Sequence, residues 1–133
     1  MIKKTIKYVD YDGNEREETH YFNLTKAEVT EMELSENGGL SKILENIVAE
    51  KDSKKMMNMF KDFIQKSYGI KSNDGRRFIK TQENLDCFMQ SEAYSELFIE
   101  LTSDDKRAAE FVNGVIPKLE NKTQHPALAN LNK

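Results

Sequence analysis

Few residues of this chain combine the type and the spacing that catalysis requires. Glu96 and Glu100 are four residues apart on one face of an expected helix, a spacing that could pair two carboxylates for acid–base chemistry. Both fall opposite the apolar stripe of that helix, so we interpret them as part of a solvated face. His20 lies late in an expected strand and has no recognisable acid or nucleophile partner. The pattern therefore predicts that the chain is not an enzyme.

Patterns for metal binding are equally weak. The run Asp10–Glu15 is similar to part of a calcium loop but lacks the full ligand spacing, and we interpret it as a hairpin turn. Cys87 is the only cysteine, which excludes an intrachain disulfide and a cysteine-based zinc site. We expect it to be a small buried hydrophobic residue. Two histidines, His20 and His125, do not favour a histidine-based site, so the sequence predicts no metal and no cofactor.

Composition narrows the class of protein. With 133 residues, the chain fits one compact domain, and 38% hydrophobic and 32% charged residues allow one modest core. The net charge of −3 argues against a general nucleic-acid binder. No apolar run approaches the roughly 18 residues of a membrane span, and the first residues lack a signal-peptide pattern. We expect a soluble intracellular protein with no nucleic-acid or membrane partner.

Charge is distributed unevenly along the chain. Residues 70–80 carry 4 basic and 1 acidic side chains, whereas residues 81–117 carry 2 basic and 8 acidic ones. The acidic half is either a solvated surface or a docking surface for a basic partner segment. The sequence leaves both interpretations open.

The first 24 residues have the pattern of a β-hairpin. Runs rich in β-branched and aromatic residues extend from Lys3 to Asp10 and from Arg16 to Phe22. Between them, Asp12-Gly13-Asn14 supplies turn chemistry, because Gly and Asn tolerate positive φ. We therefore expect two strands with one buried and one solvent-facing side.

After residue 24 the apolar spacing becomes helical. Thr25, with Glu28 three residues later, forms a capping box, and Leu24 and Val29 are spaced for a hydrophobic staple. The predicted helix ends at Asn37-Gly38-Gly39. Two further helices are predicted at about 40–51 and about 54–68, the second closed by Gly69 in a left-handed conformation.

The rest of the chain alternates turn signals and helical patterns. Residues 70–80 form a loop that can include a small hairpin around Asn73-Asp74-Gly75. Helices containing Leu85, Leu97 and Phe111 follow, the first two either separate or one helix with a break. Their expected caps are Thr81, Ser91 and either Thr102 or Ser103. We predict an α+β fold in one domain over 1–117, with a hairpin at 1–24, about five or six helices over 25–117, and a flexible tail over 118–133.

Several segments together resemble a known family. In chain order they are Tyr21–Glu28, Gly38-Gly39, Tyr68-Gly69, Asp74-Gly75, Arg77–Lys80, Ser91–Tyr94 and Ala108–Pro117. This set, over about residues 1–117, is similar to the tail assembly chaperones of long-tailed phages and prophages of Gram-positive bacteria.

The resemblance implies a non-enzymatic function in the host bacterial cytoplasm. Such chaperones bind the long, helical, aggregation-prone tape-measure protein and keep it soluble until tail-tube subunits polymerise around it. The tail tube protein is then a second expected partner. A longer form made by translational frameshifting would continue from the segment that begins at Lys118. Self-association would increase avidity along a long client.

A cluster of methionines and phenylalanines is the best candidate for client contacts. Met56, Met57, Met59, Phe60 and Phe63 cover more than one face of an expected helix. They either pack the core or form an adaptable patch that accepts apolar helices of a partner. Our hypothesis is that Met56, Met59, Phe60 and Phe63 contact the client.

Two other functions remain open. The chain could be a structural protein of the virion, such as a head–tail connector or a tail component, and would then be present in purified particles. It could instead be a phage-encoded inhibitor or adaptor of a host protein, which would copurify with it in the absence of other phage proteins.

Overall fold

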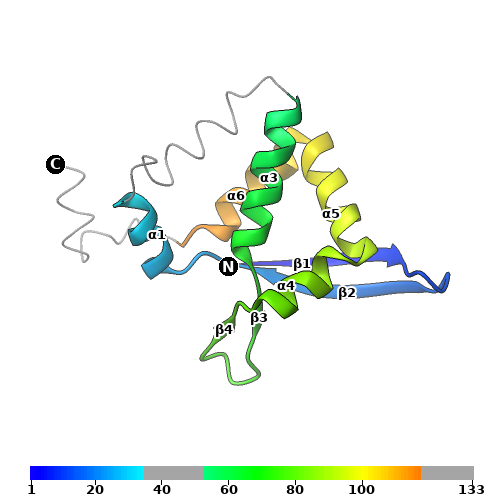
Figure 1. The fold of residues 1–133 in the computed structure, drawn as a ribbon, viewed down its shortest axis with the longest axis horizontal. Coiled ribbons are helices and arrows are strands. Elements are labelled where there is room, and N and C mark those ends of the chain that lie inside the picture. Colours follow the sequence, from blue (N-terminus) through cyan, green and yellow to red (C-terminus); the bar gives the residue numbers. More distant parts are fainter. Residues whose placement is uncertain (35–52, 118–133) are drawn as a thin grey trace.

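The computed structural model describes residues 1–34 and 53–117, and in these residues the fold is α+β, as predicted (Figure 1). The elements in chain order are β1 (Ile2–Val9), β2 (Glu15–Phe22), α1 (Lys26–Glu33), α3 (Ser53–Ser67), β3 (Tyr68–Lys71), β4 (Phe78–Ile79), α4 (Gln82–Met89), α5 (Glu92–Ser103) and α6 (Asp105–Val115). The predicted Gly joint at 37–39, the helix at 40–51 and the tail at 118–133 lie outside the described residues.

The N-terminal hairpin is confirmed. β1 and β2 pair antiparallel in one continuous register, from Ile2 opposite Phe22 to Val9 opposite Glu15. The carboxylate of Asp10 organises the turn, because it accepts hydrogen bonds from two backbone N–H groups of the turn at 2.9 Å each and from Arg16. These hydrogen bonds hold the pKa of Asp10 below its usual range. Gly13 has a φ of 84°, a conformation that glycine adopts readily and that residues with a side chain rarely adopt.

A second, smaller hairpin completes the sheet. β3 and β4 pair antiparallel around a turn in which Gly75 has a φ of 75°, and β3 also pairs with β2, so the strand order is β1-β2-β3-β4. The region over 25–117 is therefore not purely helical. The expectation that Gly69 ends a helix in a left-handed conformation was wrong, because Gly69 lies in β3. A Cβ at this position would lie 2.4 Å from the ring of Phe78, so close approach of the two strands requires glycine.

The helix caps follow the sequence signals with one exception. Thr25 and Glu28 form the predicted capping box, and the side chain of Thr81 accepts a hydrogen bond from the backbone of α4. α4 and α5 are separate helices, with Ser91 at the N-cap position of α5, although its hydroxyl donates to the carbonyl oxygen of Phe88 and makes no capping hydrogen bond. The cap of α6 is Asp104, not Thr102 or Ser103, because its carboxylate accepts from two N–H groups of the first turn.

The core lies between the helices and one face of the sheet. Inward and outward side chains alternate along β1, and α5 and α6 contact this strand while α4 contacts β3. Phe22 of β2 is fully buried, and its ring meets the rings of Tyr68, Phe88 and Phe111 edge-on at 5.2 to 5.7 Å between centroids. These contacts join the hairpin, β3, α4 and α6 into one core.

An ion pair holds α1 and the end of α3 against the second hairpin. Lys80 Nζ donates to both carboxylate oxygens of Glu28, at 2.7 and 2.8 Å, and to the carbonyl oxygen of Lys66 at 2.8 Å. Burial raises the pKa of Glu28, but these bonds and the backbone N–H of Thr25 outweigh it, so the pKa lies below its usual range. The carboxylate of the capping box therefore also positions α1 on the sheet.

The expectation for Cys87 was wrong. Its side chain is exposed, because the neighbouring Phe88 takes the inward position of α4 and is only 2% exposed. Adjacent residues of a helix point about 100° apart, and here the direction of Phe88 leads into the core whereas that of Cys87 leads to solvent.

Candidate functional site

Helix α3 carries the four residues predicted to contact a client. Phe60 and Phe63 are 1% and 3% exposed and belong to the hydrophobic core. A partner could touch them only if the domain opened. Met56 and Met59 are half-buried, and Met56 packs against the core. The structure therefore leaves two of the four side chains within reach of a partner.

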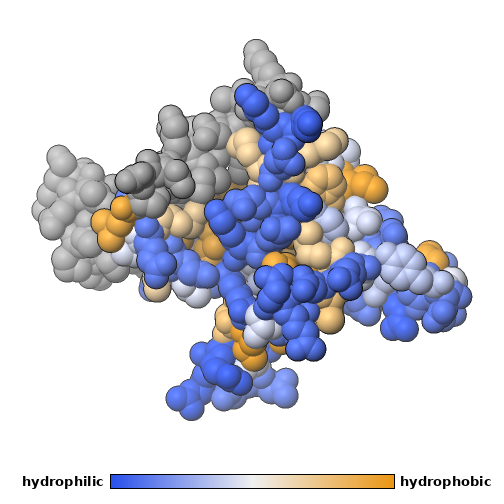
Figure 2. Space-filling model, in the orientation of Figure 1, coloured by the Kyte–Doolittle hydropathy of each residue, from blue (hydrophilic) through white to orange (hydrophobic). Residues whose placement is uncertain are grey.

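The spacing on α3 explains this division. Phe60, Phe63, Ile64 and Ser67 follow the i, i+3, i+4, i+7 pattern and are all buried. The ring of Phe63 lies 6.1 Å from that of Phe111 on α6. Met57 lies beyond this stripe and is 44% exposed. On the face of the molecule shown in Figure 2, hydrophilic residues predominate and apolar ones form small patches between them.

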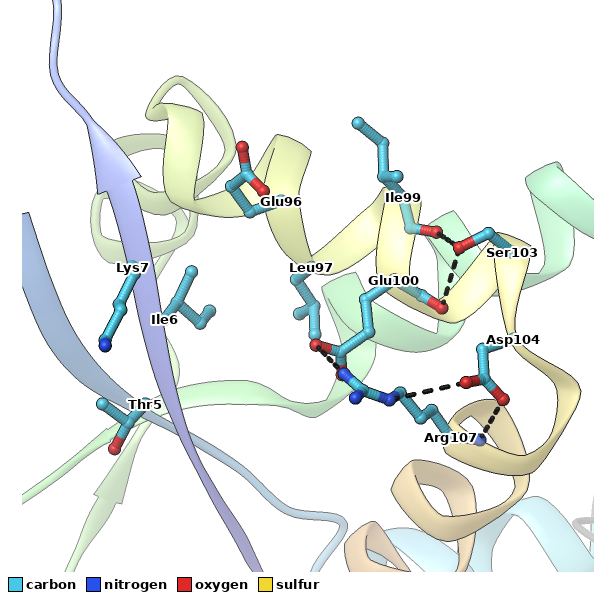
Figure 3. A pocket seen from close by; sticks show the side chains of 10 residues that line it. All are labelled: Thr5, Ile6, Lys7, Glu96, Leu97, Ile99, Glu100, Ser103, Asp104 and Arg107. Atoms are coloured by element: carbon cyan, nitrogen blue, oxygen red, sulfur yellow. Dashed lines mark hydrogen bonds and ion pairs between the residues drawn. The ribbon is translucent and has the colours of Figure 1, made fainter.

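A groove lies between β1 and the helices α5 and α6 (Figure 3). It has a volume of about 300 Å³, and its walls include Thr5 and Lys7 of β1, Ile99 and Glu100 of α5, and Arg107 of α6. A second hollow of about 600 Å³ continues toward the tip of the hairpin. The two hollows share Lys7 and Glu96, so together they follow β1 from Thr5 to Val9.

Ion pairs beside the groove link β1 to α5 and α5 to α6. Lys4 donates to one carboxylate oxygen of Glu100, and Arg107 Nη1 lies 3.4 Å from the other. Arg107 Nε also lies 3.5 Å from Asp104 (Figure 3). The side chains of Lys4 and Glu100 are only 24% and 25% exposed. The interpretation of Glu100 as a solvated residue was therefore wrong, whereas Glu96 is exposed as expected.

The role of Glu100 was missed because sequence gives the faces of a helix but not its neighbours. Within α5, Glu100 lies next to the buried positions Leu97 and Leu101. The hairpin places β1 against α5, however, and this brings Lys4 to Glu100 across 96 positions of sequence. The one available signal was the inward alternation of Ile2, Lys4 and Ile6, which places a lysine on the buried side of a strand.

His20 belongs to a small polar cluster on the inner face of the sheet. The Tyr8 hydroxyl donates to Glu18 Oε1 at 2.8 Å, and His20 Nε2 lies 3.4 Å from the same oxygen. The His20 ring lies 4.9 Å from that of Phe88. Burial lowers the pKa of His20, and the nearby Glu18 carboxylate opposes this only in part. His20 is therefore a neutral, packed histidine at pH 7.

The described residues include no group of three or more His, Cys, Asp or Glu side chains that could hold a metal ion. None of the described helices is long and apolar enough to cross a membrane. The candidate site therefore comprises the groove beside β1 and the half-buried Met56 and Met59 on α3.

Comparison with protein families decides the class. A family model described as "Phage tail assembly chaperone" matches residues 1–128. The chain belongs to this family. Membership supports a part in phage tail assembly, and a chaperone family indicates a non-enzymatic role. A search of curated proteins and a search of solved structures found no match.

Proposed function

We propose that this chaperone binds the tape-measure protein and keeps it soluble while tail tube subunits assemble around it. The observation that carries the proposal is the family match over residues 1–128. A tape-measure protein is long and helical, and before assembly its amphipathic helices expose apolar faces to water. Such faces aggregate unless a partner covers them.

Met56 and Met59 on α3 supply contacts of a suitable kind. Both are half-buried, so part of each flexible thioether side chain is accessible while the rest packs on the domain. Methionine adapts to surfaces of different shape, which suits a partner that must cover many different helices. Phe60 and Phe63 have an indirect role in this proposal. Because they are buried in the core, they fix the position of the helix that carries the two methionines.

Release is as important as binding for this function. Two half-exposed side chains give a weak contact, and affinity for a long client would come from many copies acting together. Tube subunits could then displace the copies one at a time. We propose a siphovirus-type phage or prophage of a Gram-positive bacterium as the source and the host cytoplasm as the location, with self-association and contact with the tail tube protein completing the assembly step.

Coexpression with the tape-measure protein of the same phage tests the proposal. We expect the tape-measure protein to be soluble and to copurify only when the chaperone is present. The variants Met56→Asp and Met59→Asp should lower the copurified amount several-fold, because each places a carboxylate in the apolar contact. Asn58→Asp is the matched control, since it adds the same charge to an exposed position of the same helix.

The thermal midpoint of each variant must be measured alongside, because Met56 and Met59 also touch the domain. Loss of client with an unchanged midpoint supports the proposed contact. Insoluble tape-measure protein in the presence of the wild-type chaperone would contradict the proposed function. Unchanged copurification of both methionine variants would contradict only the role of α3.

A further inference from the structure

Strand β1 is an edge of the sheet, because the strand order is β1-β2-β3-β4 and β1 pairs only with β2 among the described strands. Two hydrogen bonds fix which backbone groups point outward. Asp10 N–H donates to Asn14 O at 2.9 Å, and Asn23 N–H donates to Ser67 O at 2.8 Å on the other side of β2. By the alternation of an antiparallel ladder, the N–H and C=O groups of Lys3, Thr5, Lys7 and Val9 face the free edge.

The surroundings of this edge differ on its two sides. On the inner side lies the groove, whose α5 wall presents Ile99, 59% exposed, next to Glu96. On the outer side, Lys3 and Lys7 are exposed, and Lys7 Nζ lies 3.5 Å from a carboxylate oxygen of Glu17 on β2, an exposed pair that a binding segment could rearrange. A strand added here would have one set of alternate side chains in the groove and the other set beside the two lysines.

We propose that the β1 edge binds an extended segment of the client protein by β-strand addition, with apolar side chains of the segment directed at Ile99 and acidic ones at Lys3 and Lys7. This inference rests on the proposed function, since the segment belongs to the protein that the chaperone keeps soluble. Main-chain hydrogen bonds to the outward-facing groups of Lys3, Thr5 and Lys7 supply affinity. The alternation of apolar and acidic side chains in the segment supplies specificity.

The positive charge of the β1 edge favours a segment of the client over a second copy of this chain. Lysines on an edge strand discourage indiscriminate pairing, but the same charges attract a segment that carries carboxylates at alternate positions. A second copy of β1 would instead bring its own Lys3 and Lys7 beside those of the first. The opposite edge of the sheet, β4, consists of only two residues and offers too little backbone for stable pairing.

Thr5→Pro tests the edge with least change to the fold. The substitution removes an N–H that the β1–β2 ladder does not use, and proline is tolerated on edge strands. Thr5→Val is the matched control. Both variants lose the 3.0 Å hydrogen bond between the hydroxyls of Thr5 and Thr19, but only the valine keeps the edge N–H.

We expect Thr5→Pro to bind the tape-measure protein at least about tenfold more weakly than Thr5→Val, because strand addition loses a main-chain hydrogen bond and meets the proline ring. Lys3→Glu should weaken binding in the same direction, and more at low salt than at high salt. Lys106→Glu, an exposed position on α6, makes the same change of charge away from the edge and should have no effect.

Amide hydrogen exchange of the wild-type chaperone gives a readout that does not depend on a variant. Binding of the tape-measure protein should slow exchange at Lys3, Thr5, Lys7 and Val9, the outward-facing positions. Amides of Lys4, Ile6 and Tyr8 are already in the ladder and should change less. Slower exchange on α3 alone, without the alternation on β1, would overturn the inference.

The outcomes separate this inference from the proposed function. If the wild-type chaperone binds the client and Thr5→Pro binds as well as Thr5→Val, strand addition is wrong and the chaperone function stands. If the wild-type chaperone does not bind the client, the function itself is wrong. A dimer of the chaperone that Thr5→Pro dissociates and Thr5→Val preserves would show a second copy at the edge, and would also overturn the inference.

Discussion

Helix α3 and strand β1 offer opposite kinds of surface. α3 has the densest run of large apolar residues in the described part of the chain, yet its two phenylalanines are buried and only its methionines are partly accessible. β1 has three lysines among its eight residues, yet one of its edges pairs with none of the described strands, and a groove lies beside it. The number of apolar side chains in an element therefore does not measure its capacity to bind.

The two elements therefore differ in the groups that a partner could contact. On α3, the buried apolar side chains pack in the core, and a partner can contact only those that remain partly exposed. On β1, the outward-facing backbone N–H and C=O groups pair with no other strand among the described residues, whatever the side chains are. Under the proposed function, α3 would receive helical parts of the tape-measure protein and β1 an extended part.

Truncation on α3 gives the largest expected effect. Phe60→Ala should lower the free energy of unfolding by about 3–5 kcal/mol, because it leaves a cavity in the core. Met57→Ala, on the exposed side of the same helix, should change it by less than about 0.5 kcal/mol. Chemical denaturation measures both, and similar losses for the two variants would show that the two sides of α3 are not distinct.

The junction between α3 and the sheet gives the next largest effect. Gly69→Ala should cost about 1–3 kcal/mol, because the new Cβ would overlap the ring of Phe78. In a Phe78→Ala background the same substitution should cost less, since the opposing ring is gone. A double-mutant cycle by denaturation measures this coupling, and a cost unchanged by Phe78→Ala would mean that strand packing does not require the glycine.

Sequence predicted the elements that local chemistry determines. The hairpin follows from alternation and the Asp12-Gly13-Asn14 turn, and α1 from the capping box at Thr25 and Glu28. These features involve residues close together in the chain. The caps of α4 and α5 were predicted for the same reason.

What sequence could not give depends on neighbours far away in the chain. The pairing of β2 with β3 placed Gly69 in a strand, and no local signal distinguishes that from a helix end. The buried side of α3 was visible as a pattern, but which of its apolar residues remain accessible depends on α5 and α6. The groove was not predictable, because it is formed by β1 and by α5, almost a hundred residues apart.

The free energy of unfolding should depend on pH through His20 on the inner face of the sheet. Burial lowers the pKa of His20 in the folded state, so below about pH 6.5 the unfolded state binds more protons than the folded one. The contribution of His20 to stability is therefore present above that pH and is lost as the pH falls. His20→Phe should flatten the loss of stability between about pH 7.5 and 5, and an unchanged slope would assign it to other groups.

The ion pairs beside the groove give the smallest effect. Glu100→Gln should lower the free energy of unfolding by about 1 kcal/mol or less, because the carboxylate is partly exposed and screened. Glu96→Gln, exposed on the same helix, should have no measurable effect. Thermal denaturation at low and high salt compares the two, and an equal response would show that Lys4 and Glu100 do not tie β1 to α5.

The most direct test of the central claim uses purified components. Denatured tape-measure protein is diluted into buffer with increasing amounts of the chaperone, and light scattering reports aggregation. We predict that scattering falls as the ratio of chaperone to client rises and that the two proteins then elute together in size-exclusion chromatography. Scattering equal to that seen with an unrelated protein of similar size and charge would contradict the account.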